Sequence, residues 1–355
     1  MDALSTSSSA SSDWDTLPKL SVSDLLHQIS LEQVPSEDHA RKCQDIALSL
    51  VGILEKEMGP SLSGHVMVAG SYGKGTAIVN DSDYDIVIFF NELEPPFTKV
   101  LEDMERALKG NADRFKGFKW RFRSSIHICF DVEGIRFDLT PAAQLDNNFQ
   151  WNRWCCFAPS LLTPYPSQQY VKTLQKISKM KDPEATSYLY SSSLSIDAVV
   201  FVQRQNAFIH SVIRLAKHWA SHVNTGRIQI RGKSLLVETV AIHASYSLSP
   251  VEMINRNLDK AFIKFLELFS DARTLRLYVF VNYQREDIPD SVFNQTPLVL
   301  DPANPYNNLL SPGNFPILAL KCFEDAAKIT NSKVKAWMEC NDSDSLLFKL
   351  VFDIP

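Results

Sequence analysis

The chain has 355 residues, of which 45% are hydrophobic and 22% are charged, and its formal net charge is −5. This length suits two lobes or one large domain, and the acidic balance excludes a protein that holds nucleic acid through overall positive charge. Any RNA or DNA contact must therefore come from a local basic patch. No apolar run is long enough for a bilayer and the six cysteines form no C-x-x-C, so we expect a cytoplasmic protein without a membrane partner.

The first half of the chain mixes helical and strand patterns. Residues 1–12 are a serine-rich, low-complexity segment that we expect to be disordered. Apolar spacing and Gly or Pro breakers predict helices at 20–29, 37–58 and 97–108, and strands at 66–69, 86–90, 120–122, 126–131 and 135–139. A short helical turn is expected from Ser71 onward.

The second half of the chain is mainly helical. Beyond about residue 191 the pattern predicts helices at 196–223, 234–248, 251–269 and 314–329, with one strand at 275–283. Strands concentrated early and helices concentrated late indicate an α+β fold. We expect a first lobe at 13–190 that carries the chemistry and a helical C-terminal lobe at 191–355.

The most informative motif joins a Gly-Ser turn to a pair of acids. Gly70 and Ser71 follow a short apolar strand, and Asp83 and Asp85 open the next one. Side chains alternate along a strand, so both carboxylates project from the same face and repel each other unless a cation lies between them. Mg²⁺ prefers such oxygens and often bridges them to phosphates, while the turn can bring backbone N–H groups and a hydroxyl to a phosphate. The motif predicts the active site of a metal-dependent nucleotidyltransferase.

A third acid and a lysine extend this motif. Asp138 lies within an apolar strand, where an unpaired carboxylate is costly. Alone it could be an edge-strand residue that caps the next turn, but with Asp83 and Asp85 it suits a site for two Mg²⁺ ions, where it could also help to deprotonate an attacking hydroxyl. Lys217 is the candidate cation for a triphosphate, although a lysine on a solvated helix face is the common alternative.

These segments resemble the 2′-5′-oligoadenylate synthetase family, within the wider group that includes cyclic GMP-AMP synthase. The matching segments are Gly70-Ser71-x-Gly73-Lys74-Gly75-Thr76, Ser82-Asp83-x-Asp85, Phe137-Asp138-x-x-Pro141-Ala142 and Ile213-Arg214-Leu215-x-Lys217-His218-Trp219. The resemblance covers roughly residues 20–335 and implies a polymerase-β-like nucleotidyltransferase core. It also implies ATP as donor and acceptor, attack by a ribose 2′-hydroxyl and an innate-immune type of signal.

The resemblance also assigns residues to the donor nucleotide. Ser71 and Lys217 would contact its phosphates, with Gly70 forming the turn. The segment that begins at Lys233 is similar to the family's segment for phosphate and base, which puts Ser234 and Leu235 at the nucleotide. Leucine stands there in place of an aromatic residue, so a stacking contribution of roughly 1–3 kcal/mol is missing. Base specificity is therefore open.

A second departure concerns activation by double-stranded RNA. Vertebrate members carry a basic insert before the helix of Lys217, and here residues 201–208 run almost directly into that helix. The nearby cations that remain are Arg204, His210 and Arg214. Because phosphate contacts dominate binding to double-stranded RNA, we expect a weaker, altered or absent RNA dependence.

Three functions remain open at this stage. The first is an enzyme that joins ATP into 2′-5′-linked oligoadenylates with release of pyrophosphate, which the late Asn282-Tyr283 and Asp301-Pro302-Ala303 segments favour. The second is a cyclic dinucleotide synthase, for which Leu235 and the missing insert leave room. The third is a catalytically inactive nucleic-acid sensor, which the three retained acids disfavour.

Overall fold

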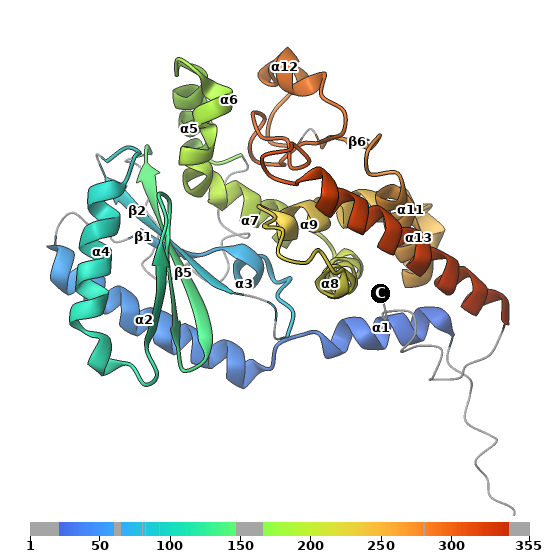
Figure 1. The fold of residues 1–355 in the computed structure, drawn as a ribbon, viewed down its shortest axis with the longest axis horizontal. Helices are drawn as coiled ribbons and strands as arrows, with labels where there is room; N and C mark the ends of the chain where they lie inside the picture. The colour runs from blue at the N-terminus through green and yellow to red at the C-terminus, as the bar shows by residue number, and fades with distance from the viewer. Residues whose placement is uncertain are drawn as a thin grey trace, which may run out of the picture.

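A computed structural model describes residues 21–59, 65–79, 81, 83–91, 93–146, 166–279 and 281–340. The segment at 1–12, for which we predicted disorder, and Ser82 of the motif lie outside the described residues. Figure 1 shows a sheet with flanking helices on one side of the molecule and a group of helices on the other. Among the described residues, no helix is long and apolar enough to cross a membrane.

The sheet has five strands in the order β1-β2-β5-β4-β3. They are β1 (His65–Val68), β2 (Tyr84–Asn91), β3 (Lys119–Arg123), β4 (Ile128–Val132) and β5 (Ile135–Gln144). The central pair, β2 and β5, is parallel and the other pairs are antiparallel. In this parallel pair Asp85 is directly opposite Asp138.

The two faces of the sheet have different covers. Ile86 and Ile88 of β2 point into a core formed with helices α2 (Glu37–Met58) and α4 (Thr98–Gly110). Val87 and Phe89 point the other way, into a smaller cluster with α7 (Ser195–Gln203). By alternation Asp85 belongs to this second face. The acids therefore lie on the same face as Val87 and Phe89, at the end of β2 that α7 does not cover.

The second part of the molecule is built from long helices. They are α8 (Ala207–His222), α9 (Lys233–Tyr246), α11 (Leu258–Ser270) and α13 (Ile317–Cys340). Trp219 of α8 is fully buried at their centre, where its ring contacts those of Phe265, Phe269 and Phe323. The first described helix, α1 (Val22–Glu32), packs against α8 and α11 of this part. The lobe boundary at residue 190 stays a prediction.

Two of the helices predicted as continuous are broken. The predicted helix at 196–223 is α7 followed by α8, because the side chain of Asn206 accepts a hydrogen bond from the Ile209 N–H and caps a new helix. The predicted helix at 251–269 is α10 (Pro250–Ile254) followed by α11, and Arg256 between them has a φ of 53°. Local caps thus divide stretches whose apolar pattern is continuous.

Other elements differ in length from the prediction. Among its described residues, the predicted strand at 275–283 contains only β6 (Arg276–Leu277), which pairs with β7 (Leu298–Val299). Helix α13 continues to Cys340, past the predicted end at 329. The sequence analysis did not anticipate the segment that lies beside the sheet between β5 and α7. It consists of α5 (Gln168–Ser178), α6 (Pro183–Thr186) and the 3₁₀ helix η6 (Ser187–Leu194).

Candidate active site

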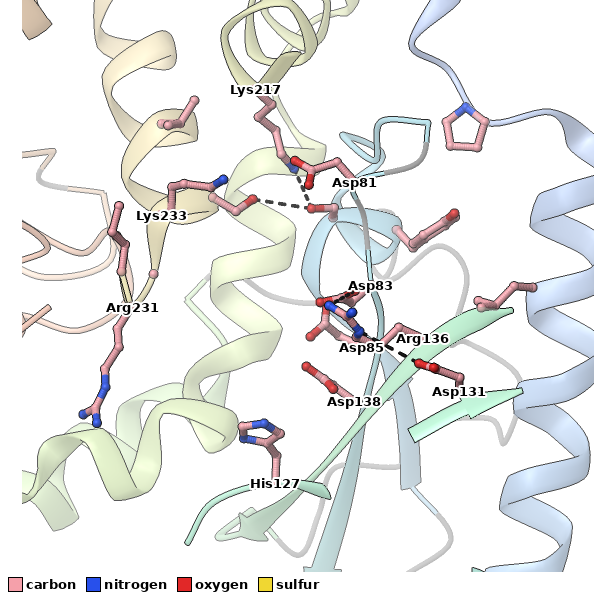
Figure 2. A pocket seen from close by; sticks show the side chains of 18 of the residues that line it. Asp81, Asp83, Asp85, His127, Asp131, Arg136, Asp138, Lys217, Arg231 and Lys233 are labelled. Carbon is pink, nitrogen blue, oxygen red and sulfur yellow. Dashed lines mark hydrogen bonds and ion pairs between the residues drawn. The ribbon is translucent and has the colours of Figure 1, made fainter. Parts of the chain in front are cut away.

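The three predicted acids lie along one edge of a large cavity. Asp83 precedes β2, Asp85 is on β2, and Asp138 is the neighbour of Asp85 on β5. We call these three side chains the carboxylate wall. They line a cavity of about 1360 Å³, together with Ser71 of the Gly-Ser turn and residues of α8 and α9 that include Lys217. Figure 2 shows the three carboxylates gathered at the ends of these strands.

The carboxylate wall is electrostatically unsatisfied. Burial raises the pKa of Asp85 to about 7, and the neighbouring charges of Asp138 and Asp83 add to that rise. Burial likewise raises the pKa of Asp83, against the opposing effect of a nearby arginine, Arg136. Oδ1 of Asp138 is buried and has no hydrogen-bond partner among the described residues. A cation between β2 and β5 would oppose the rise in the pKa values of Asp85 and Asp83 and would give Asp138 Oδ1 a partner.

The donor set of the carboxylate wall fits a hard divalent ion such as Mg²⁺. Carboxylate oxygens are the ligands that Mg²⁺ prefers, and the unpartnered Oδ1 of Asp138 gives one of them a free position. In the described part of the chain, however, no three or more His, Cys, Asp or Glu side chains are arranged so that they could hold a metal ion. Asp83 is instead engaged by Arg136, whose Nη1 lies 3.4 Å from Asp83 Oδ1.

The Gly-Ser turn approaches the carboxylate wall more closely than any side chain would permit. Gly70 begins α3 (Gly70–Lys74) with a φ of 54°. A Cβ added there would lie 1.7 Å from Asp85 Oδ2 and 2.5 Å from its Cγ. The N–H of Ala69 donates to the backbone oxygen of Asp85 at 2.9 Å, which fixes the turn to β2. Glycine is therefore required at 70 both by backbone conformation and by space.

Lys217 reaches the Gly-Ser turn from the helical side. Its Nζ donates to Ser71 Oγ at 2.5 Å, to the Thr76 carbonyl at 3.1 Å and to Glu238 Oε1 at 3.2 Å. Ser234, at the start of α9, is next to it, with its Oγ 3.5 Å from Ser71 Oγ. The sequence prediction thus selected three polar residues, Ser71, Lys217 and Ser234, that the structure brings together. The alternative of a solvated lysine does not hold for Lys217, which is buried.

A buried ion-pair network lies behind this contact. Glu238 accepts from Lys74 Nζ at 2.8 Å and from Thr76 Oγ1 at 2.8 Å, in addition to Lys217. Burial alone would raise the pKa of Glu238, but the two ammonium groups lower it to about 2. Burial lowers the pKa of Lys217, and Glu238 opposes that shift. We call Lys74, Lys217, Glu238 and Thr76 the ion-pair network.

Sequence reasoning gave no role to Glu238 or Arg136. A signal was present for Glu238, because it is the one charged residue in the apolar run at 235–242. Lys74, which the sequence presents only as part of the motif around Ser71, is also buried. Leu235 packs against the helical core and is not among the residues that line the cavity, although Ser234 and Val237 beside it are.

Cations that the sequence suggested for an RNA face are held by the protein itself. Arg214 Nη1 donates to the Gly75 carbonyl at 3.2 Å, and Nε2 of His210 lies 2.9 Å from the Val202 carbonyl oxygen. Only three residues separate α7 from α8, so no additional basic segment is present at this junction. The local positive charge near this junction therefore mostly serves internal contacts.

Two family models match the chain. A model described as a nucleotidyltransferase domain matches residues 52–136, which include Asp83 and Asp85. A model described as 2′-5′-oligoadenylate synthetase 1, domain 2, C-terminus matches residues 164–340, which include Lys217, Ser234 and Leu235. The chain belongs to the 2′-5′-oligoadenylate synthetase family of nucleotidyltransferases. The resemblance seen in the motifs is confirmed.

Curated members of this family are distant relatives. Mouse 2′-5′-oligoadenylate synthase 3 is 25% identical over 279 residues, which cover 72% of this chain and 23% of that protein. The chain thus spans about a quarter of the length of the first relatives that it matches.

Solved structures confirm the predicted α+β fold, with its polymerase-β-like core and helical C-terminal lobe. CdnC of E. coli MS115-1, in a complex with HORMA-deltaN, superposes with a TM-score of 0.62 at 17% identity, covering 93% of this chain and 96% of that chain. The Cid1 poly(U) polymerase with Mg and 3′-dATP bound superposes with a TM-score of 0.57 at 12% identity, covering 94% and 98%.

Proposed function

We propose that this nucleotidyltransferase joins ATP into 2′-5′-linked oligoadenylates, releasing pyrophosphate, as a cytoplasmic signal of innate-immune type. The observation that carries the proposal is the pairing of Asp85 with Asp138 across β2 and β5, with Ser71 and Lys217 facing the same cavity. An anionic edge and a cationic edge across one cavity suit a metal-bound triphosphate. Membership of the synthetase family supports ATP and the 2′-5′ linkage.

In this proposal Asp83, Asp85 and Asp138 hold two Mg²⁺ ions. Two such ions, when bound, stabilise both the attacking and the leaving oxygen of an in-line displacement. Asp138 also helps to deprotonate the attacking 2′-hydroxyl. Asp85, with a pKa raised to about 7, is deprotonated when it becomes a ligand.

Ser71 and Lys217 bind the donor phosphates. Lys217 Nζ already donates to Ser71 Oγ, so the ammonium and the hydroxyl are oriented before the nucleotide enters. Glu238 keeps the buried Lys217 charged, because it opposes the effect of burial on the lysine pKa. Lys233 lines the cavity and points toward Lys217, so it adds positive charge near the polyphosphate, whereas Arg231 lines the cavity but points away from Lys217 (Figure 2). The base packs without an aromatic platform at position 235.

Activation by double-stranded RNA is weak, altered or absent in this proposal. The junction between α7 and α8 is short, and Arg214 and His210 engage backbone carbonyls there. Because binding to RNA rises with the number of phosphates neutralised, the small number of cations at this junction gives a low affinity.

A product assay tests the proposal. Purified protein is incubated with Mg²⁺ and labelled ATP, with and without GTP and double-stranded RNA, and the product is digested with a 3′-5′-specific nuclease. We expect a nuclease-resistant ladder from ATP alone, changed little by RNA. A single product that lacks terminal phosphates and requires a second nucleotide would instead establish the cyclic dinucleotide synthase. No product under any condition, with RNA-binding retained, would establish the inactive sensor.

A further inference from the structure

Arg136 is a cation within the proposed metal site. It lies on β5 two residues before Asp138 and therefore projects from the same face of the sheet. Its Nη1 is 3.4 Å from Asp83 Oδ1, and its Nε is 4.0 Å from Asp131 Oδ1. Figure 2 shows Arg136 extending across the carboxylate wall between Asp83 and Asp131. One guanidinium group thus lies between two acids, of which only Asp83 belongs to the carboxylate wall.

Asp131 offers this guanidinium an alternative partner. It is on β4 directly opposite Arg136 in the antiparallel register. It also accepts from Arg121 Nε at 2.6 Å, so it already anchors a second arginine at this edge of the sheet. A carboxylate has two oxygens and about four acceptor positions, so Asp131 can receive both arginines. A small rotation of the Arg136 side chain would exchange Asp83 for Asp131.

The pair formed by Arg136 and Asp83 is weak enough to exchange. The side chains are 43% and 40% exposed, and exposed ion pairs contribute little because water and salt screen them. Arginine cannot lose its proton at any ordinary pH, so it can give up Asp83 only by moving. A guanidinium at Asp83 Oδ1 lowers the affinity of this carboxylate for a divalent ion, because the two cations repel each other at that distance.

We propose that Arg136 is a resident cation for Asp83, that it competes with the divalent metal ion, and that it moves to Asp131 when the metal binds. The inference rests on the proposed function, because it takes the carboxylate wall to be the metal site. Without metal, Arg136 offsets the mutual repulsion of the three carboxylates. With metal, its charge stays at the rim of the cavity, paired with Asp131. Arg136 is thus a positioning residue that sets metal affinity.

Metal binding without nucleotide tests this inference. Mn²⁺ is titrated into wild-type protein, Arg136→Gln and the matched control Arg121→Gln, with free Mn²⁺ followed by electron paramagnetic resonance. Arg121 carries the same charge and contacts the same Asp131, but pairs with no acid of the carboxylate wall among the described residues. We expect R136Q to bind Mn²⁺ about two- to fivefold more tightly, in line with the loss of one exposed ion pair. R121Q should change the affinity less than about twofold on the same basis.

Two further variants separate the alternatives. Arg136→Lys keeps the charge without the forked guanidinium, and its affinity should lie between those of wild type and R136Q; melting temperatures verify that each variant is folded. Equal gains in R136Q and R121Q, or no gain in R136Q, would overturn the inference. The product assay is independent of this result. If the wild-type protein makes oligoadenylates but R136Q binds Mn²⁺ no more tightly, only the role of Arg136 is refuted. If the wild-type protein makes no product, but Mn²⁺ binding is lost in Asp138→Asn and stronger in R136Q, only the proposed function is refuted.

Discussion

The two sides of the cavity differ in how completely their charges are paired. On the sheet side, the carboxylate wall has an unpartnered Asp138 Oδ1 and an Asp85 whose pKa is raised to about 7. On the helical side, Glu238 accepts from Lys74, Lys217 and Thr76, and its pKa is lowered to about 2. Charges that lack opposite charges beside them indicate where a ligand binds, whereas charges that are fully paired within the protein stabilise the fold. The following predictions break or sharpen this contrast, from the largest expected effect to the smallest.

Removing an acid from the carboxylate wall should abolish catalysis with little effect on folding. In Asp138→Asn the proton acceptor and a metal ligand are lost together, so the turnover rate should fall by at least about a thousandfold, or about 4 kcal/mol. The melting temperature should stay the same or rise, because the repulsion among the three carboxylates is reduced. Asp103→Asn, an acid on the surface of α4, is the control and should leave turnover unchanged. A D138N protein with near-normal turnover would contradict the assignment.

Removing the acid of the ion-pair network should, by contrast, mainly reduce the stability of the fold. Glu238→Gln leaves the buried ammonium groups of Lys74 and Lys217 without a counter-charge, which should lower the free energy of unfolding by about 3 kcal/mol. Urea denaturation followed by circular dichroism measures it. Glu105→Gln, which breaks exposed pairs with Lys109 and Arg123, should cost less than about 1 kcal/mol. If the two variants are equally stable, the network does not hold the fold.

Adding one carbon at Gly70 of the Gly-Ser turn should displace Asp85 of the carboxylate wall. In Gly70→Ala the new Cβ would lie 1.7 Å from Asp85 Oδ2, so Asp85 must move and the strained positive φ adds to the cost. We expect turnover to fall about a hundredfold, as for a misplaced catalytic group. Gly52→Ala is the matched control, because nothing lies within 4 Å of its added Cβ. A G70A enzyme as active as G52A would show that the close approach has no role in the chemistry.

The raised pKa of Asp85 gives a pH-dependent stability in the absence of metal. The unfolded group has its ordinary value of 3.8, and the folded group has a pKa of about 7. Between these values the folded protein holds a proton that the unfolded chain releases, so the free energy of unfolding decreases as pH rises. Asp85→Asn lacks this component, while the other titrating groups remain in both proteins.

The difference in melting temperature measures this effect. In EDTA, D85N should gain on wild type by roughly 3 °C or more between pH 5 and pH 8. Mg²⁺ should reduce the gain, because a bound cation favours the ionised carboxylate. A difference that does not change with pH would mean that Asp85 has an ordinary pKa in the folded protein.

For two residues of the carboxylate wall the sequence carries a local signal. Asp83 and Asp85 are two residues apart on a strand, and alternation alone puts them on one face. Asp138 required an inference from motif order, since strand pairing between β2 and β5 is not written in either segment. Helix α2 was predicted with its observed ends, Glu37 and Met58, because Ser36 caps it and Gly59 follows it.

The charges that depend on distant partners could not be predicted. The position of Arg136 beside Asp83 follows from the register of β5 with β2 and β4, which only the folded sheet defines. Lys74 and Glu238 are 164 residues apart. The apolar run around Glu238 is the one local feature that distinguishes it from a surface charge, and Lys74 has no such feature. The break between α7 and α8 was missed because the cap at Asn206 interrupts a continuous apolar pattern.

The central claim is that both sides of the cavity act on one metal-bound nucleotide. A crystal structure with Mn²⁺ and a non-reactive ATP analogue tests it most directly, because anomalous scattering locates the metal independently of the protein. The account predicts Mn²⁺ bound by Asp83, Asp85 and Asp138, with the triphosphate contacting Ser71 Oγ and Lys217 Nζ. Mn²⁺ bound away from these carboxylates, or a triphosphate that contacts neither Ser71 nor Lys217, would contradict it.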